Sequence, residues 1–294
     1  MPGTENYKSI TIVGVGLIGG SLAMALRKSG FEGRIRGVSR PEPLEEAIGK
    51  GLIDEGFDYQ QLGEAVSGSQ LVVLATPISR IIELIAELGA VGDALAPGTV
   101  ITDVGSVKAS VVRVVERVLP RFVGSHPLCG SEKVGVVHAH GDLFEGAVCA
   151  VTPTGQSDAE AVEMVSGFWP ALGGKVVSLT AEDHDAIVAR TSHLPHVVAS
   201  ALVNAVLARP RAGESEFLGT GFRDTTRLAS GSPSMWRDIA LTNAEAIARS
   251  IDELQVELEQ LKTALGAKDA EALEKFFADG KSGRDGWLAS LEKK

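Results

Sequence analysis

Short apolar runs alternate with longer amphipathic stretches along the first 180 residues of the chain. Most apolar runs are bounded by Gly, Pro or Asp, and the amphipathic stretches carry apolar residues three to four positions apart, as on one face of a helix. Because parallel strands need a helical crossover between them, this alternation predicts a parallel sheet. The predicted strands are Ser9–Val13, Arg34–Val38, Leu71–Ala75, Thr99–Asp103, Arg121–Gly124, Ala147–Thr152 and Lys175–Leu179, and the predicted helices are Leu17–Ser29, Leu44–Lys50, Ser79–Val91, Lys108–Val118 and Asp158–Leu172.

The pattern changes near residue 180, after which strand signals stop and the sequence is typical of helices. We therefore predict two domains, residues 1–180 and residues 181–294, the second of them all-α. A heptad seam follows alternating four- and three-residue steps: Ala240, Ala244, Ile247, Ile251, Leu254, Leu258, Leu261 and Leu265. A helix buried in its own domain would explain this seam. We favour a helix packed across a subunit interface, and hence a homodimer, because so short a helical tail needs partners for its apolar faces.

Charge and composition exclude several classes of protein. With 28 Lys+Arg against 38 Asp+Glu, the net charge is −10, which argues against a nucleic-acid partner. No apolar run approaches the roughly 18 residues of a membrane span, and the first residues lack a signal-peptide pattern, so we expect a cytoplasmic protein and no membrane partner. The two cysteines, Cys129 and Cys149, lack metal-site spacing, and we expect reduced thiols and no metal.

A glycine-rich turn, Gly14-Val15-Gly16-Leu17-Ile18-Gly19, joins the first predicted strand to the first predicted helix. In a G-x-G-x-x-G turn the first glycine permits the tight turn, the second lets backbone approach a pyrophosphate, and the third allows close packing of helix on strand. The helix N-terminus adds unpaired N–H groups. This context predicts a Rossmann-type dinucleotide-binding domain with cofactor contacts from Gly14, Gly16, Leu17, Ile18 and Gly19.

The second predicted strand ends in Ser39-Arg40, where an NAD-binding turn would carry an acid for the ribose. A hydroxyl followed by a guanidinium suits a 2′-phosphate, so we predict NADP as the preferred cofactor over NAD. An Arg40 that is only a solvated loop cation is the alternative. Thr76, Pro77 and Asp103, at the ends of two further strands, are the remaining expected cofactor contacts.

Polar side chains gather in two segments that follow predicted strands, Asp103–Lys108 and Gly124–Lys133. Ligands of open α/β sheets bind at the carboxyl ends of the strands, so both segments should border the cofactor. His126 is the candidate general base, because imidazole has an ordinary pKa near neutrality. Ser106 could share the proton that His126 takes. A histidine with only a structural role is the alternative.

Six motifs occur in order between about residues 9 and 240: GVGLIGGS, DVGSVK, GSHPLCGSEK, LTAEDHD, SHLPH and GFRDTTR. Together they resemble the prephenate/arogenate dehydrogenase family of tyrosine biosynthesis. The resemblance implies a Rossmann-type domain followed by an all-α dimerisation domain. It also implies NAD(P)-dependent oxidative decarboxylation of a small cyclohexadienyl substrate, with Lys108 supplying local positive charge.

The helical half contributes the expected substrate contacts. His193 and His196 share a polar stripe with Ser200 and Asn204, and spacing alone fits a solvated face as well as a site wall. Pro195 could kink the helix there. The resemblance favours the wall and identifies Arg227 as the carboxylate-binding cation. The other candidate substrate contacts are Gly221, Asp224, Trp236 and Glu132, although Trp236 could equally pack in a core and Glu132 could be a solvated acid.

The motifs leave the substrate open between prephenate, which we place first, and arogenate. Another dehydrogenase of similar architecture, acting on a 3-hydroxy acid, is a second interpretation; it would normally place a lysine on the first long helix of the helical domain, where this chain has histidines. A non-enzymatic redox sensor that only binds the nucleotide is a third, and it leaves His126, Ser106 and Arg227 without a role.

Overall fold

The computed structural model describes residues 3–4, 7–91, 94–115, 119, 121–130, 133–211 and 213–291. Its strands form one eight-stranded sheet in the order β3-β2-β1-β4-β5-β6-β7-β8. Every neighbouring pair is parallel except β6 and β7. The strands are β1 Ser9–Val13, β2 Arg34–Val38, β3 Glu55–Phe57, β4 Leu71–Leu74, β5 Val100–Asp103, β6 Phe122–Pro127, β7 Val148–Thr152 and β8 Lys175–Ser178.

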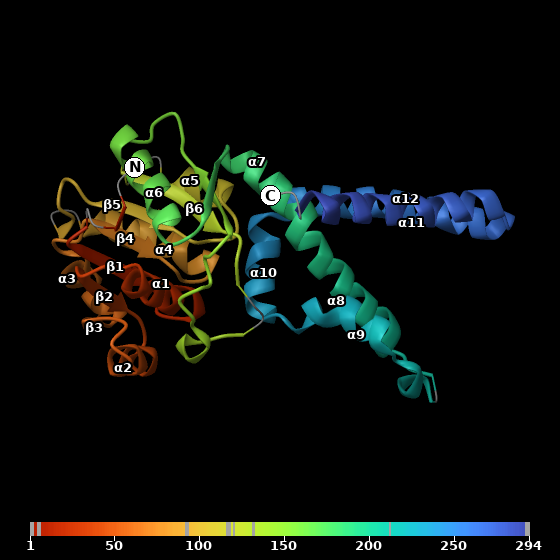
Figure 1. Cartoon of the computed structure of the whole chain (residues 1–294), viewed down its shortest axis with the longest axis horizontal. Helices are drawn as coiled ribbons and strands as arrows, with labels where there is room; N and C mark the ends of the chain where they lie inside the picture. Colours follow the sequence, from red (N-terminus) through yellow and green to blue (C-terminus); the bar gives the residue numbers. More distant parts are fainter. Residues whose placement is uncertain are drawn as a thin grey trace. The chain divides into compact units, whose positions relative to one another are not determined.

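Helices, several of which are labelled in Figure 1, connect the strands and cover the sheet. The four residues of β4 are all buried, as expected for a central strand covered on both faces. On α4, buried Ile and Leu residues recur at helical spacing and form its core-facing side. The helices of this part are α1 Leu17–Lys28, α2 Pro41–Gly49, α3 Leu62–Val66, α4 Ile78–Ala90, α5 Ala109–Val115 and α6 Ala159–Ala171.

Sequence and structure differ at two strands. Strand β3 was not predicted, because its three residues are too few to form a detectable pattern. The predicted strand Arg121–Gly124 continues to Pro127, because β7 pairs antiparallel with it from Gly124 to Pro127. His126 accordingly lies on a strand, opposite Ala150, and not in a loop. Residues 116–118 of the predicted helix Lys108–Val118 lie outside the described residues.

Strand register brings the predicted cofactor segments to one edge of the sheet. Val13 pairs with both Val38 and Leu74, and Leu74 pairs with Asp103. The four strands therefore end level with one another, and the glycine turn and the segments that follow Val38, Leu74 and Asp103 begin at this edge. This is the edge at which open α/β sheets bind ligands.

The elements after Ser178 that the structure describes are all helical, which with the sheet confirms the predicted fold class. Helix α7 continues through a π-helical turn, η5, into α8, and Pro195 stands in the first turn of α8. Proline lacks the N–H that an α-helix needs at this point, so the wider turn lies where the regular ladder is interrupted. The elements are α7 Ala181–Val188, η5 Ala189–His193, α8 Leu194–Leu207, α9 Thr220–Thr226, η7 Arg227–Ser230, α10 Pro233–Thr242, α11 Ala244–Ala267 and α12 Ala270–Leu291.

Contacts divide the chain into two compact units, residues 1–244 and 245–294. Within the first unit α9 contacts α8 (Figure 1). The heptad seam is interrupted at Asn243, so Ala240 lies on α10 and the rest of the seam on α11. None of the helices in the described ranges has the length and apolar character to cross a lipid bilayer.

Candidate active site

The glycine turn is shaped by contacts that only glycine allows. Gly14 has φ +103°, and a Cβ there would lie 2.7 Å from the Ala75 carbonyl carbon and oxygen and 2.8 Å from Thr76 Cγ2. A Cβ on Gly19 would collide with the backbone oxygen of Gly14. A Cβ on Gly16, in contrast, would meet nothing within 4 Å. Two glycines thus hold the turn together, and the third keeps a space open beside it.

The groups around this space fit a dinucleotide. Helix α1 begins after Gly16 without a side-chain cap, so its first N–H groups face the turn, and Leu17 and Ile18 are half-buried there. The hydroxyl of Thr76 is buried and has no hydrogen-bond partner among the described residues. Pro77, exposed at the start of α4, continues the same edge.

Four side chains gather where β2 ends. Ser39 is buried, and Arg40 is exposed before the first turn of α2. Tyr59 lies beside both: burial raises the pKa of its hydroxyl, which the hydrogen bond with Ser39 and the charges of Arg80 and Arg40 oppose. The guanidinium of Arg80 stands 5.2 Å from the Tyr59 ring centre. This cluster offers hydroxyls, positive charge and an aromatic face at the end of the second strand.

Lys108 and Asp103 form an ion pair with no exposed side-chain surface. The ammonium of Lys108 also donates to the Ser125 carbonyl at 2.9 Å. The Asp103 carboxylate accepts, in addition, the N–H groups of Gly105 at 2.9 Å and Ser125 at 3.2 Å. Both side chains, which the sequence placed at the site, are thus buried beside Gly124 of β6, and their hydrogen bonds hold Gly105 and Ser125, next to Ser106 and His126.

His126 is half-buried and contacts His184 of α7, which in turn contacts Asp185. Its Nδ1 lies 2.8 Å from Nε2 of His184, and Nδ1 of His184 lies 2.8 Å from Oδ1 of Asp185. The Asp185 carboxylate also accepts the N–H of Lys108 at 2.7 Å and that of Ala109 at 2.9 Å. Because Nδ1 of His126 faces His184, Nε2 is the ring nitrogen left for a substrate. Burial first, then the charges of His184, Lys108 and His193, hold the pKa of His126 well below its ordinary value.

The two histidines of the SHLPH motif surround Trp236. His193 is buried, and its Nδ1 lies 3.3 Å from Nδ2 of Asn243, which also donates to the Asp185 carbonyl at 2.9 Å. The ring of His196 stacks on Trp236, and His196 Nδ1 donates to the Ser192 carbonyl at 3.1 Å. Burial lowers the pKa of His193 to about 4 and that of His196 below its ordinary value.

The remaining predicted substrate contacts divide into two groups. Arg227 begins η7 and lies near enough to His196 that its charge lowers the pKa of that ring. Gly221 and Asp224 stand exposed on α9, where Asp224 pairs with Arg223 at 3.5 Å. Ser200 and Asn204 of the polar stripe are also exposed. Ser106 is half-buried on the segment between β5 and α5, and Glu132 lies outside the described residues.

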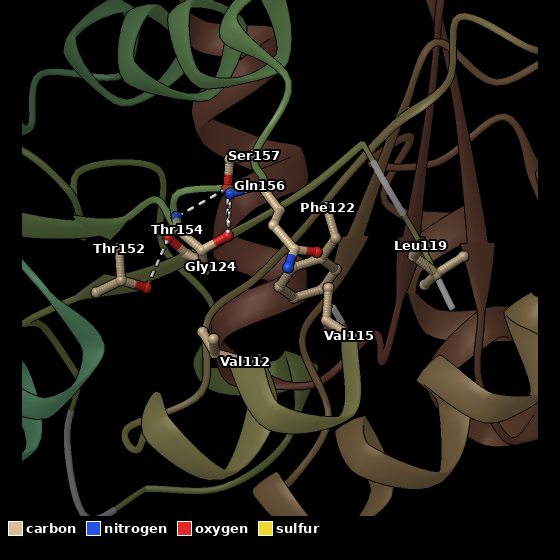
Figure 2. A pocket seen from close by; sticks show the side chains of 9 residues that line it. All are labelled: Val112, Val115, Leu119, Phe122, Gly124, Thr152, Thr154, Gln156 and Ser157. Atoms are coloured by element: carbon tan, nitrogen blue, oxygen red, sulfur yellow. Dashed lines mark hydrogen bonds between the residues drawn. The ribbon is translucent and has the colours of Figure 1, made fainter. Parts of the chain in front are cut away.

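A small pocket lies away from these groups, between α5 and the residues that follow β7 (Figure 2). Its lining is apolar on one side, with Val112, Val115 and Phe122, and polar on the other, with Thr154 and Ser157. Its volume of about 60 Å³ is far below the roughly 300 Å³ or more of ordinary ligand sites. The hydroxyls of Thr154 and Ser157 bond to each other and to nearby backbone.

Three residues of the site, His184, Asp185 and Asn243, were not predicted from the sequence. Their partners are distant in sequence: His184 is 58 positions from His126, and Asn243 is 50 positions from His193. The signal available was the motif LTAEDHD, in which a histidine directly precedes an aspartate. The described residues contain no cluster of His, Cys, Asp and Glu that could hold a metal ion.

Comparison with known proteins identifies the family. Residues 22–178 match the profile described as the prephenate dehydrogenase nucleotide-binding domain, and residues 180–279 match the prephenate dehydrogenase dimerization domain. Prephenate dehydrogenase of Bacillus subtilis (strain 168) is 37% identical over 284 residues, which cover 95% of this chain and 76% of that protein.

Two solved structures agree with these matches. The crystal structure of prephenate dehydrogenase from A. aeolicus, in complex with hydroxyphenyl propionate and NAD+, has 35% identity and a TM-score of 0.89, covering 94% of this chain and 97% of the other. Arogenate dehydrogenase of Synechocystis has 32% identity and a TM-score of 0.80, covering 95% and 99%. These relatives do not favour the 3-hydroxy acid dehydrogenase or the redox sensor. With a nucleotide-binding domain of the NAD(P) type in its first half, the chain belongs to the prephenate/arogenate dehydrogenase family.

Proposed function

We propose that the protein catalyses the NADP-dependent oxidative decarboxylation of a cyclohexadienyl substrate, with prephenate as the first candidate and arogenate as the second. The observation that carries this proposal is the place of His126. Its ring stands at the sheet edge where the dinucleotide turn lies, with Nδ1 bound to His184 and Nε2 left for a hydroxyl. A neutral imidazole so placed is suited to take a proton as an alcohol is oxidised.

Each expected side chain then has a role that its position supports. Nε2 of His126 takes the proton of the ring hydroxyl, and Ser106 hydrogen-bonds that hydroxyl. Lys108 acts through its charge and not through direct contact with the substrate, because its buried ammonium is bound to Asp103 and Ser125. Arg227 binds a substrate carboxylate, as an arginine does with planar donors.

The other candidates shape the substrate site. His196 and Trp236 form a stacked wall, and His193 supports it from the buried side. Asp224, Gly221 and Glu132 are proposed as substrate contacts on the motifs alone. The bound nicotinamide would supply the hydride acceptor. Loss of carbon dioxide follows because the new ketone is conjugated to the carbon that bears the carboxylate, and the ring becomes aromatic.

The preference for NADP is supported by the groups at the end of β2. Ser39 and Arg40 stand where an NAD-binding turn would carry an acid. Arg40 and Tyr59 present positive charge and an aromatic face beside the Ser39 hydroxyl, whereas the nearby Arg80 is paired with Glu83 and Glu87. A 2′-phosphate gains charge-assisted hydrogen bonds from such a cluster, whereas a ribose hydroxyl gains little. Thr76, Pro77 and the glycine turn are assigned to the rest of the cofactor, and Asp103 to holding the segment that carries Ser106.

We also propose that the functional boundary lies near residue 180 and that the protein is a homodimer. The end of β8 at Ser178 and the matched ranges of the two family profiles support the boundary. The match to a dimerization domain supports the dimer. The cytoplasmic location stays a prediction.

The test is a steady-state comparison of the purified protein with prephenate and with arogenate, each paired with NADP and with NAD. We expect reduced nicotinamide to form fastest with prephenate and NADP. His126→Asn should lower kcat by about 10²- to 10⁴-fold, the usual contribution of a general base, while His138→Asn, on an exposed histidine, should not. No turnover in any of the four pairings, by folded protein that binds the nucleotide, would reject the proposal.

A further inference from the structure

Three side chains stand in a row at the sheet edge. The row runs from Nδ1 of His126 on β6 to Nε2 of His184, and from Nδ1 of His184 to the Asp185 carboxylate, both on α7. Each step is 2.8 Å, and His184 and Asp185 are almost fully buried. The row therefore links the proposed base to a carboxylate that solvent scarcely reaches.

Hydrogen-bond chemistry fixes the proton on each ring. The Asp185 carboxylate also receives two backbone N–H groups, so it is an acceptor toward His184, and Nδ1 of His184 carries the proton. In neutral His184 the other nitrogen, Nε2, is then an acceptor, so Nδ1 of His126 carries a proton. In neutral His126, Nε2 is consequently the unprotonated nitrogen that a substrate hydroxyl meets. Asp185 thus determines the tautomer of a ring that it does not touch.

We propose that His184 and Asp185 are positioning residues that set the tautomer of His126 and accept, on His184, the positive charge that His126 would otherwise hold. When the substrate O–H bond breaks, the proton joins Nε2 of His126. The proton on Nδ1 of His126 passes to Nε2 of His184, and Nδ1 of His184 keeps its proton against Asp185. His126 ends neutral with its proton on Nε2, and His184 ends as an imidazolium beside the carboxylate.

The charges around the two rings favour this transfer. His126 faces the positive Lys108 and the neighbouring rings of His184 and His193, and burial lowers its pKa. Asp103 on β5 is paired with Lys108. His184 contacts Asp185 and lies near His193, whose pKa burial lowers to about 4, so that His193 stays neutral near pH 7. Of these groups, Asp185 is the one whose negative charge directly contacts a histidine ring, and that ring belongs to His184.

This inference rests on the proposed role of His126, and its test separates the two. The variant is His184→Gln, whose side-chain oxygen can still accept the Nδ1–H of His126 but cannot take up a proton. His184→Phe removes the acceptor as well. His138→Gln, the same change on an exposed histidine, is the matched control.

Two readouts are needed. The first is the pH profile of kcat for the wild type and the three variants. The second is the titration of individual imidazoles by NMR with ¹⁵N-labelled histidine, which is simple in a chain with six histidines. Circular dichroism and NADP binding check that each variant is folded.

We expect His184→Gln to bind NADP as the wild type does, with kcat lowered about 10- to 100-fold and the acid limb of the profile moved to lower pH, because His126 alone is a weaker base. His184→Phe should lose more activity, and His138→Gln none. In wild-type spectra the first proton should appear on His184 while His126 stays neutral. In His184→Gln, His126 should titrate at a lower pH than His184 does in the wild type.

Wild-type kcat and an unchanged acid limb in His184→Gln would overturn the inference, and so would spectra in which His126 protonates first. Absence of turnover in the wild type would reject the proposed function, and the spectra would still decide whether His184 takes the proton.

Discussion

The indole of Trp236 stacks on the imidazole of His196, with ring centres 3.8 Å apart and ring planes at 29°. The same indole meets His193 in a T-shaped arrangement, with ring centres 5.9 Å apart and ring planes at 80°. Trp236 comes from α10, whereas the histidines come from η5 and α8. The indole therefore packs α10 against the continuous segment of η5 and α8. Behind it, a Cβ on Gly231 would lie 2.6 Å from Trp236 Nε1, which shows how closely the backbone approaches.

We expect Trp236→Ala to weaken substrate binding while Trp236→Phe largely keeps it. A stacked aromatic pair contributes about 0.5–1.5 kcal/mol beyond its buried area, so loss of the stack should raise KM about 2- to 10-fold. Phenylalanine restores a ring for His196 but not the indole N–H, which has no partner among the described residues. Steady-state KM and kcat for both variants check this. Equal KM values for Trp236→Ala and the wild type would show that the stack does not order the substrate site.

Local pattern was enough to predict most of the sheet and the glycine turn. Gly14, Gly16 and Gly19 act within one strand, turn and helix, so their spacing already contains the geometry that the structure shows. The strand ends followed because short buried runs are bounded by residues that break strands. Strand β7 was predicted but its antiparallel direction was not, because the direction of pairing depends on which strand lies beside it in space.

The site was predictable residue by residue but not as a network. His126 was found from its place after a strand, yet its link to His184 joins positions 58 apart, and no local pattern contains that pairing. The family resemblance implied that Lys108 supplies positive charge to the site. Its burial against Asp103 depends on the neighbouring strand β6, and the local sequence pattern does not reveal this packing. The sequence therefore identified residues of the site, but not the pairings between distant positions that arrange them.

Lys108→Met should destabilise the protein more than most single substitutions. It would leave the buried carboxylate of Asp103 without its counter-charge, and breaking a buried pair from one side costs about 3–5 kcal/mol. Adding Asp103→Asn should recover part of this loss, because the amide is uncharged and its oxygen can still accept one backbone N–H. Urea unfolding of both variants measures the difference. If the double variant were no more stable than the single one, uncompensated charge would not be the cause.

The stability of the protein should depend on pH through His193. Burial lowers its pKa from 6.5 to about 4, so the unfolded chain binds the proton more readily than the folded protein does. Above pH 6.5 both states are neutral at this ring and the full stability is present. As pH falls from 6.5 to 4 the unfolded state is favoured, with a total loss of about 3 kcal/mol from this group.

His193→Gln removes this titration, so its unfolding free energy should fall less steeply between pH 6.5 and 4 than that of the wild type. Comparing the two proteins cancels the contribution of the carboxylates, which titrate in both. Parallel pH profiles for the two proteins would mean that His193 has an ordinary pKa when folded.

Arg40→Gln tests the cofactor preference. We expect its KM for NADP to rise about tenfold or more, since one charge-assisted contact to a phosphate is worth roughly 1.5 kcal/mol or more, while its KM for NAD stays unchanged. Arg34→Gln is the matched control. Arg34 starts the same strand at the opposite edge of the sheet and pairs with Glu55 at 3.3 Å. If both variants changed the two KM values alike, Arg40 would be only a surface charge.

Gly16→Ala and Gly19→Ala should separate nucleotide binding from folding. A Cβ on Gly16 meets nothing within 4 Å and its φ of −102° lies outside the left-handed region, so the unliganded Gly16→Ala variant should unfold closer to the wild-type temperature than Gly19→Ala does. The methyl group would stand in the open space that we assign to the pyrophosphate, and we expect at least about a tenfold loss of NADP affinity, or roughly 1.4 kcal/mol. A Cβ on Gly19 collides with the Gly14 carbonyl, so Gly19→Ala should lower the unfolding temperature even without nucleotide. Thermal unfolding and NADP titration of both variants check the contrast. A Cβ on Gly16 meets no described residue of the protein within 4 Å, so its effect on binding would come from a clash with the nucleotide. Unchanged NADP affinity in Gly16→Ala would therefore place the pyrophosphate elsewhere.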